Sequence, residues 1–249
     1  MQPDIVSRWL SPDPLRHLEP GWTPYRFGFN NPIIYTDPTG LYEDWVESAD
    51  GDVYWDDNAT SQSTTKAGET YLGKNVIVGT HNRDKSGNEE INTATFDLYL
   101  ESNKTGPSAS INGNTVPSDI SKSGTLAEGL YSAKSGSRSK YVARGEEDLA
   151  ILINGGNSVP TTANSPKASM TEVFFHMGNN HQTSLFDSRG NAYSAGCQTS
   201  GCYPGSRENH NEFMSTVGTN FNGSYYLRSK PVLSVPNLAP FSSDIQGGN

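Results

Sequence analysis

The alternation of apolar and polar residues predicts mostly short strands. Residues 93–101 alternate with a period of two over their centre, which is typical of a strand with one buried face. Other short runs rich in β-branched, aliphatic or aromatic residues are also predicted to be strands: 52–55, 75–78, 149–153, 171–176 and 225–228. The best helix candidate is 208–217, in which Phe213, Met214 and Val217 are spaced for one face. We therefore expect a mainly β fold with one or two short helices.

Composition divides the chain into four segments. Residues 1–41 combine spaced Pro residues with many aromatic residues, which need a surface to bury against. Residues 42–90 are acidic and Ser/Thr-rich, so we expect a linker with short strands. The core is expected within 91–235, with a Gly/Ser/Pro-rich loop at 104–124, and 236–249 is expected to be a flexible tail.

The composition makes several classes of protein improbable. The chain has 249 residues, a net charge of −9 and 33% hydrophobic residues, and its longest aliphatic run, 149–153, is too short for a membrane span. A net negative charge argues against nucleic acid as a partner. Two Cys residues are too few for a disulfide scaffold. The first thirty residues show no apolar signal-peptide core, so we expect a fusion partner or dedicated machine to carry out any export.

The first segment carries three fixed motifs: RWLSPDPL at 8–15, NNPI at 30–33 and DPTGL at 37–41. Together they resemble the carboxyl end of the core region of RHS-repeat proteins, especially the bacteroidete type. The resemblance implies an upstream RHS shell in a full-length parent and a variable toxin domain after the motif. It also implies cleavage after Leu41, with Asp37 involved.

Candidate chemistry concentrates between His176 and Cys202. Three of the five His residues and both Cys residues lie between positions 176 and 210. His176 closes an apolar strand, and Gly196 permits a tight turn that presents the Cys197 thiol beside backbone N–H groups. His176 can then take the thiol proton, which gives a nucleophilic Cys–His pair.

Three other interpretations of the same residues stay open. Cys197 and the His residues can be ordinary structural residues of the fold. Cys197 and Cys202 are close enough in sequence to form a disulfide within a loop. Alternatively, both Cys residues can bind zinc with one or more of three His residues: His176, His181 and His210.

The segments FFHMGN (174–179) and SAGC (194–197) are similar to the sequence signature of YkuD-like L,D-transpeptidases, and TLAEGLY (125–131) resembles an upstream element of that family. The resemblance implies an L,D-transpeptidase-like β-sandwich at 91–235, with Cys197 as nucleophile and His176 as general base. It implies that Ser194 and Gly196 shape the nucleophile turn and that nearby backbone N–H groups form the oxyanion hole. We expect four residues to contact substrate: Gly178, Asn179, His181 and Gln198. No cofactor or metal is expected.

Two positions depart from the family pattern. Ala195 stands where the family often has His, and Thr199 follows Gln198 where many members have an Arg that binds the substrate carboxylate. Arg189 and Arg207 are the candidates to supply that positive charge.

Together, the two resemblances predict a secreted antibacterial effector that acts in the periplasm of a target bacterium. It would cleave or exchange the terminal D-Ala of peptidoglycan stem peptides by cysteine acyl transfer, as an L,D-carboxypeptidase or an L,D-transpeptidase. A cognate immunity protein is expected to block the cleft. The alternatives are a nuclease toxin, suggested by Asn209-His210-Asn211, and a binding module whose Cys and His are structural.

Overall fold

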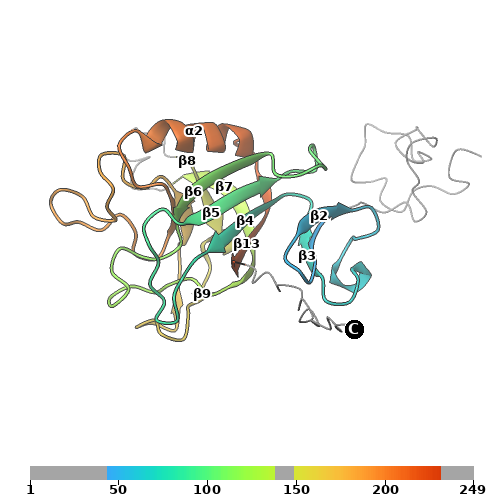
Figure 1. Ribbon diagram of the computed structural model, residues 1–249, viewed down its shortest axis with the longest axis horizontal. Helices are drawn as coiled ribbons and strands as arrows, with labels where there is room; N and C mark the ends of the chain where they lie inside the picture. The colour runs from blue at the N-terminus through green and yellow to red at the C-terminus, as the bar shows by residue number, and fades with distance from the viewer. Residues whose placement is uncertain (1–43, 138–148, 231–249) are drawn as a thin grey trace, which may run out of the picture.

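A closed eight-stranded barrel forms the main body of the protein (Figure 1). The computed structural model describes residues 44–137 and 149–230. Around the barrel the strand order is β11-β12-β6-β5-β4-β13-β7-β8. Neighbouring strands are antiparallel except β11 with β12 and β13 with β4, which are parallel. The strands are β4 (Val76–His81), β5 (Ala94–Tyr99), β6 (Ala109–Asn114), β7 (Gly129–Ser137), β8 (Leu149–Ile153), β11 (Phe174–His176), β12 (Gln198–Ser200) and β13 (Asn222–Ser229).

The main hydrophobic core follows from the alternation along the strands. In β5, Ala94, Phe96 and Leu98 are fully buried, whereas Thr95 and Asp97 are only partly buried and point to the other face. Phe96 contacts the Phe175 ring of β11, with ring centroids 4.7 Å apart. Each such side chain contributes about 1.5–3 kcal/mol when it is fully buried, so these inward-facing positions hold the barrel together.

Helix α2 (Ser206–Val217) packs beside the barrel and covers part of its core (Figure 1). Phe213, Met214 and Val217 are buried in the main core, and Phe213 lies 5.6 Å from the Phe175 ring between centroids. The helix is followed by Gly218, whose N–H donates to the Met214 carbonyl at 3.0 Å. The helix predicted at 208–217 is therefore confirmed.

A smaller three-stranded sheet lies against the outside of the barrel (Figure 1). It has the order β2-β1-β3, with β1 (Asp44–Glu47), β2 (Val53–Asp56) and β3 (Thr70–Gly73), and a short 3-10 helix, η3 (Gln62–Thr64), precedes β3. Trp45 and Leu72 form a second apolar cluster with Val76 and Val78 of β4. The outward side chains of β4 are thus buried by this sheet instead of facing water.

Two short elements complete the described fold. Residues after β8 form a 3-10 turn, η4 (Asn154–Gly156), and a small two-stranded ribbon of β9 (Val159–Pro160) and β10 (Ser169–Met170). Within the described ranges, no helix is long and apolar enough to cross a membrane.

The mainly β prediction is confirmed, and each predicted strand overlaps an observed one, with the same ends at 149–153 and shifted ends elsewhere. The sheet is continuous around the core, so the two layers expected of a sandwich are opposite walls of one barrel. The barrel also includes β4, so it begins before residue 91, and much of 42–90 is a packed sheet instead of a linker. The RHS-like motifs at 1–41 and the predicted tail at 236–249 lie outside the described residues.

The prediction of a loop at 104–124 was wrong over part of that range, because residues 109–114 form β6. The strand ASINGN has one large apolar residue, Ile111, which packs into the main core. Backbone pairing with β5 on one side and β12 on the other holds this polar sequence in the barrel. Gly113 permits that pairing, because a Cβ there would lie 2.0 Å from the Thr199 carbonyl oxygen.

Candidate active site

The parallel pairing of β11 with β12 determines where His176 and Cys197 lie. Phe175 is paired with Gln198, and His176 with Thr199. Phe175 is in the main core, and Gln198 bonds to the core residue Tyr225, so this pair points into the barrel. Alternation therefore assigns His176 and Thr199 to the other face, and Cys197 directly precedes Gln198, the first residue of β12. His176 therefore ends one strand, and Cys197 directly precedes its parallel neighbour, although the two residues are 21 positions apart in the sequence.

His176 is held in a defined tautomer. Its side chain is 1% exposed, and its Nδ1 lies 2.7 Å from the Met177 carbonyl oxygen. A carbonyl oxygen only accepts hydrogen bonds, so Nδ1 carries the proton. In the neutral ring Nε2 is then the basic nitrogen, which is the form a general base requires.

Ser194 organises the turn that leads into Cys197. Its Oγ accepts the Gly196 N–H at 3.1 Å and donates to the Cys197 carbonyl oxygen at 2.6 Å. The Ser194 N–H donates in turn to the Ser118 Oγ at 3.1 Å, and the Ser118 N–H donates to the Ser194 carbonyl at 2.9 Å. The structure therefore places Ser194 in the turn, as the sequence predicts, and adds Ser118, which sequence reasoning missed.

Gly196 is the tightest point of this turn. Its φ is 131°, and a Cβ at this position would lie 2.5 Å from Met170 Sδ and 2.9 Å from the Gly124 carbonyl oxygen. Both the backbone conformation and the packing therefore require glycine. Because the Gly196 N–H is bonded to Ser194 Oγ, this geometry gives no support to it as an oxyanion-hole donor.

The two cysteines have different environments. Both are free thiols, so the disulfide alternative is wrong for this structure. Cys197 is partly exposed, with its Sγ 3.9 Å from the Glu172 carbonyl oxygen. Cys202 is fully buried, its Sγ accepts the Asn179 N–H at 3.3 Å, and burial raises its thiol pKa. Only Cys197 therefore combines exposure with a place in the turn.

The residues expected to contact substrate are mostly inside the protein. Asn179 and Gln198 are fully buried. Asn179 donates from Nδ2 to the Phe186 carbonyl and accepts the His181 N–H on Oδ1. Gly178 packs closely against the backbone, because a Cβ at this position would lie 2.3 Å from the Ser200 carbonyl oxygen. These three residues are therefore enclosed by the fold, and the sequence pattern could not show that the Asn179 and Gln198 side chains point inward.

His181 is the exception among these predicted contacts, since its side chain is exposed in the loop that Asn179 organises. Arg189 and Arg207 are also exposed on the surface.

A polar network that the sequence did not indicate joins the barrel interior to the turn before Cys197. The Tyr225 hydroxyl donates to Gln198 Oε1 at 3.2 Å, and Gln198 Nε2 donates to the Gly196 carbonyl at 3.4 Å. Tyr225 is fully buried, and burial raises its pKa well above the ordinary value. Since no water reaches this pair, the bonds fix the orientation of Gln198 beneath the turn.

Arg83, directly beyond β4, is a second missed feature. It donates to the Thr115 carbonyl and to the Leu126 carbonyl, both at 2.8 Å. These bonds hold both ends of segment 115–126, in which the Gly124 carbonyl oxygen lies beside Gly196. The only sequence signal was a basic residue shortly after a predicted apolar strand.

The geometry does not favour the metal alternative. Among residues 44–137 and 149–230, no three His, Cys, Asp or Glu side chains gather as a metal site requires. His210 is 2% exposed, accepts from Ser200 Oγ at Nδ1 and donates from Nε2 to the Leu149 carbonyl. With both ring nitrogens used inside the fold, it is poorly placed to bind zinc or to serve a nuclease.

Comparison of the chain with family models, with curated proteins and with solved structures found no match.

Proposed function

We propose that this protein is a cysteine acyl-transfer enzyme that acts on peptidoglycan stem peptides. The observation that carries the proposal is the arrangement on β11 and β12. His176, with Nδ1 protonated in its bond to Met177, ends β11, and Cys197, at the end of the Ser194 turn, directly precedes β12, which is paired with β11. A buried, oriented imidazole beside a partly exposed thiol is the pattern of an activated Cys nucleophile.

The chemistry follows from these positions. His176 Nε2 takes the Cys197 thiol proton, and the thiolate attacks the carbonyl carbon of the third stem residue. The amide bond to the terminal D-Ala breaks, the leaving amine takes the proton from His176, and a thioester remains on Cys197. Water then releases a shortened peptide, or an amine releases an exchanged one, with His176 again accepting and returning the proton.

The resemblance of residues 8–41 to an RHS core supports a biological setting for this chemistry. We place the protein as the toxin part of an RHS-associated effector that reaches the periplasm of a target bacterium. A cognate immunity protein that covers Cys197 would protect the producing cell.

The test is to incubate the protein with purified disaccharide-tetrapeptides and to weigh the products. The expected change is loss of one D-Ala, or its replacement when another D-amino acid is added. Cys197→Ala should lower the rate by more than about a thousandfold, because the nucleophile is removed.

Cys202→Ala is the matched control, since it removes the other thiol without touching the turn. With the fold verified by circular dichroism, this variant should keep most of its activity. Full activity of Cys197→Ala would contradict the proposal. Unchanged muropeptides together with nicked nucleic acid would instead favour the nuclease alternative.

A further inference from the structure

A groove of about 680 Å³ lies away from the Cys197 turn, between α2 and the outer face of β5 and β6. Its floor consists of two cross-strand pairs, Thr95 with Asn112 and Asp97 with Ser110. These residues alternate with the buried positions of both strands, so their side chains face outward. The volume is within the range of about 300–1,000 Å³ that is usual for small-ligand sites.

One face of α2 forms the wall of the groove. Asn209, Glu212 and Thr216 line it, and their spacing of three and four residues puts them on one side of the helix. At one end, Asn209 Nδ2 donates to the hydroxyl of Tyr203, another lining residue, at 2.6 Å. The groove therefore has a polar floor and a polar wall, held on two regular elements.

Several polar groups in the groove are not used by the fold. The side chains of Thr95, Asn112 and Glu212 make no hydrogen bond with the described residues, and one carboxylate oxygen of Asp97 accepts from Ser110. The Ser108 Oγ is buried at the groove and has no partner. The groove thus offers hydroxyl, amide and carboxylate groups to a ligand that both donates and accepts.

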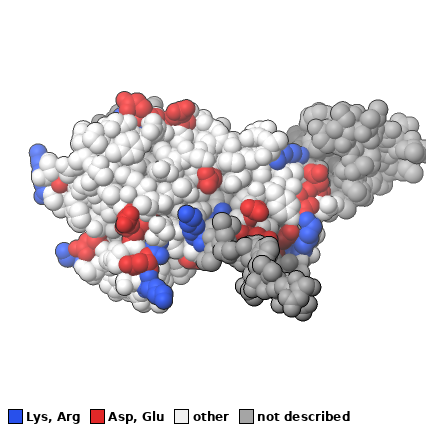
Figure 2. Space-filling view, in the orientation of Figure 1, with Lys and Arg blue, Asp and Glu red and all other residues white. Residues whose placement is uncertain are grey.

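The charge of the lining narrows the class of ligand. The lining contains two carboxylates, Asp97 and Glu212, and no Lys or Arg. In Figure 2 the surface below α2 is mostly uncharged, with acidic side chains along α2 above it and basic ones only farther away. An anionic ligand, nucleic acid included, would meet repulsion here without a compensating cation. Ala109 and Tyr203, which are only partly buried, add apolar surface between these polar groups, which suits a ligand with polar edges and apolar faces.

We propose that this groove binds a short stretch of uncharged, N-acetylated oligosaccharide. Sugar hydroxyls donate to the two carboxylates and accept from the Asn amides, and the ring faces cover the apolar patches. The identification of this sugar as the glycan strand of peptidoglycan rests on the proposed function. The strand that follows Cys197, β12, is hydrogen-bonded to β6, so the groove and the nucleophile turn are built on adjacent strands.

The test is a calorimetric titration of the Cys197→Ala variant of the whole 249-residue chain with the tetramer of N-acetylglucosamine. Because this variant lacks the nucleophile, binding is measured independently of any acyl transfer. We expect saturable binding that Asn112→Ala and Glu212→Ala each weaken at least tenfold. Asn211→Ala is the matched control, since Asn211 is exposed on α2 outside the groove lining and its loss should leave the affinity unchanged.

Two results would overturn the proposal. One is the absence of saturable tetramer binding by folded protein. The other is equal weakening by Asn211→Ala, which would place the sugar elsewhere. If the sugar did not bind and a Lys-rich peptide did, and Glu212→Ala weakened that peptide, the groove would be a site for a cationic ligand instead. None of these outcomes bears on D-Ala release from muropeptides, so this proposal and the enzymatic one fail separately.

Discussion

The hydroxyl of Ser194 donates a hydrogen bond to the carbonyl oxygen of Cys197 at 2.6 Å, and its own oxygen, Oγ, accepts the N–H of Gly196 at 3.1 Å. Ser194 is 2% exposed, so water does not compete for these bonds. One side chain therefore closes a four-residue turn at the proposed nucleophile.

Ser194→Ala should slow the acyl-transfer step while leaving the fold intact. Loss of both bonds loosens the turn, and a misplacement of about 1 Å at a reacting atom lowers rates by about a hundredfold. We expect kcat to fall about tenfold to a hundredfold with a smaller change in KM, measured on muropeptides. Ser215→Ala, on the exposed face of α2, is the control and should be silent. Unchanged alkylation and turnover rates in Ser194→Ala would show that the turn does not need this hydroxyl.

Gly196→Ala should destabilise the protein by about 3 kcal/mol or more, because overpacking and a positive φ both oppose it. The new Cβ would meet Met170 Sδ at 2.5 Å and the Gly124 carbonyl at 2.9 Å, and the backbone oxygen cannot rotate away. Gly190 is the matched control, since it also has a positive φ but nothing lies within 4 Å of its Cβ position. Gly190→Ala should cost only about 1–2 kcal/mol from the backbone conformation. Urea unfolding measures both, and equal losses would contradict the packing argument.

Tyr225→Phe should cost about 1–3 kcal/mol, because it leaves the Gln198 Oε1 buried without its donor. Adding Gln198→Met should recover part of that loss, since the unpaired amide is then removed as well. Tyr131→Phe is the control. Its hydroxyl donates to the Ala127 carbonyl, but the side chain is only partly buried, so water can replace it. A double-mutant cycle by urea unfolding gives the coupling, and additive effects would argue against the Tyr225–Gln198 bond.

His81 should make stability fall as the solution becomes acidic. Burial, together with the charge of Arg83, lowers its pKa below the ordinary 6.5, although Glu128, 2.9 Å away, acts in the opposite direction. Below pH 6.5 the unfolded chain therefore binds more protons at this residue, and stability is lost as pH falls through the folded pKa.

The measurement for His81 is the urea midpoint at about pH 7.5 and about pH 5.5. His81→Gln should lose less stability over this interval than the parent protein does, because the titrating imidazole is gone. His181→Gln, at an exposed position, should follow the parent. A steeper loss in His81→Gln would mean that protonation of His81 stabilises the fold through Glu128.

Periodicity revealed the barrel strands whose inner faces are apolar, but not the residues that join elements distant in sequence. β5 and α2 were predicted because Phe96, Leu98 and Phe213 recur at strand or helix spacing. β6 was missed because it carries one large apolar residue, Ile111, and its pairing with β12 crosses 85 positions. A single sequence contains no signal for such a pairing.

The same limit explains the site. The rarity of Cys and His drew attention to Cys197 and His176, of which one directly precedes β12 and the other ends its neighbour β11. Asn179 was assigned to substrate because it is polar and adjacent to the motif, yet its amide is used to hold the following loop. A polar side chain near a motif faces solvent or the interior according to which face of its strand it lies on and how the adjoining loop runs. Only the tertiary structure supplies this information.

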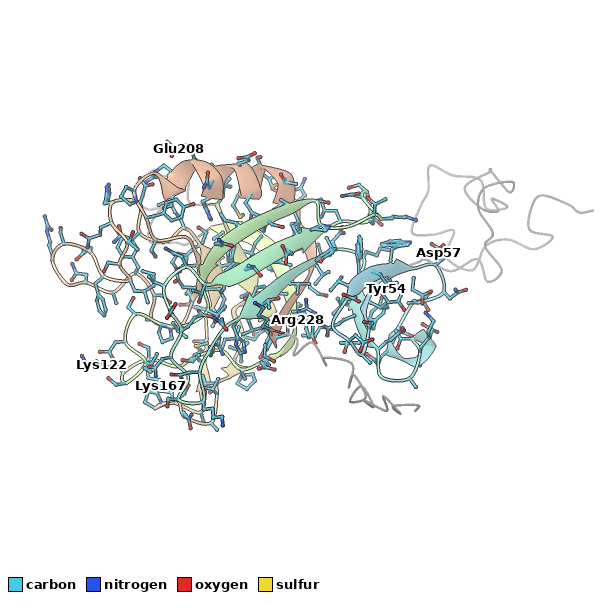
Figure 3. The ribbon with its side chains drawn as sticks, viewed as in Figure 1. Tyr54, Asp57, Lys122, Lys167, Glu208 and Arg228 are labelled. Carbon is cyan, nitrogen blue, oxygen red and sulfur yellow. The ribbon has the colours of Figure 1, made fainter. Side chains whose placement is uncertain are left out.

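The small sheet is fastened to the barrel by a charge pair that is largely buried. Arg228 of β13 is paired with Glu47 of β1, and the two side chains are 15% and 10% exposed. Glu47 also accepts from the Tyr226 hydroxyl at 2.5 Å, and Arg228 donates to the Gly51 carbonyl at 2.6 Å. Figure 3 shows Arg228 at the junction between the barrel and the smaller sheet.

Arg228→Met should destabilise the protein by about 3–5 kcal/mol, because it leaves the Glu47 carboxylate buried without its cation. Lys74→Met provides the matched control. The Lys74 ammonium and the Glu101 carboxylate are 3.5 Å apart, but the two side chains are 34% and 52% exposed. Exposed pairs of this kind contribute about 0–1 kcal/mol to the free energy of unfolding. The double variant Glu47→Leu with Arg228→Met should regain much of the loss, since both charges are then gone. Urea unfolding followed by tryptophan fluorescence reports on this sheet directly, because Trp45 and Trp55 lie in it. If Arg228→Met and Lys74→Met lost the same stability, the buried pair would not be what holds the sheet in place.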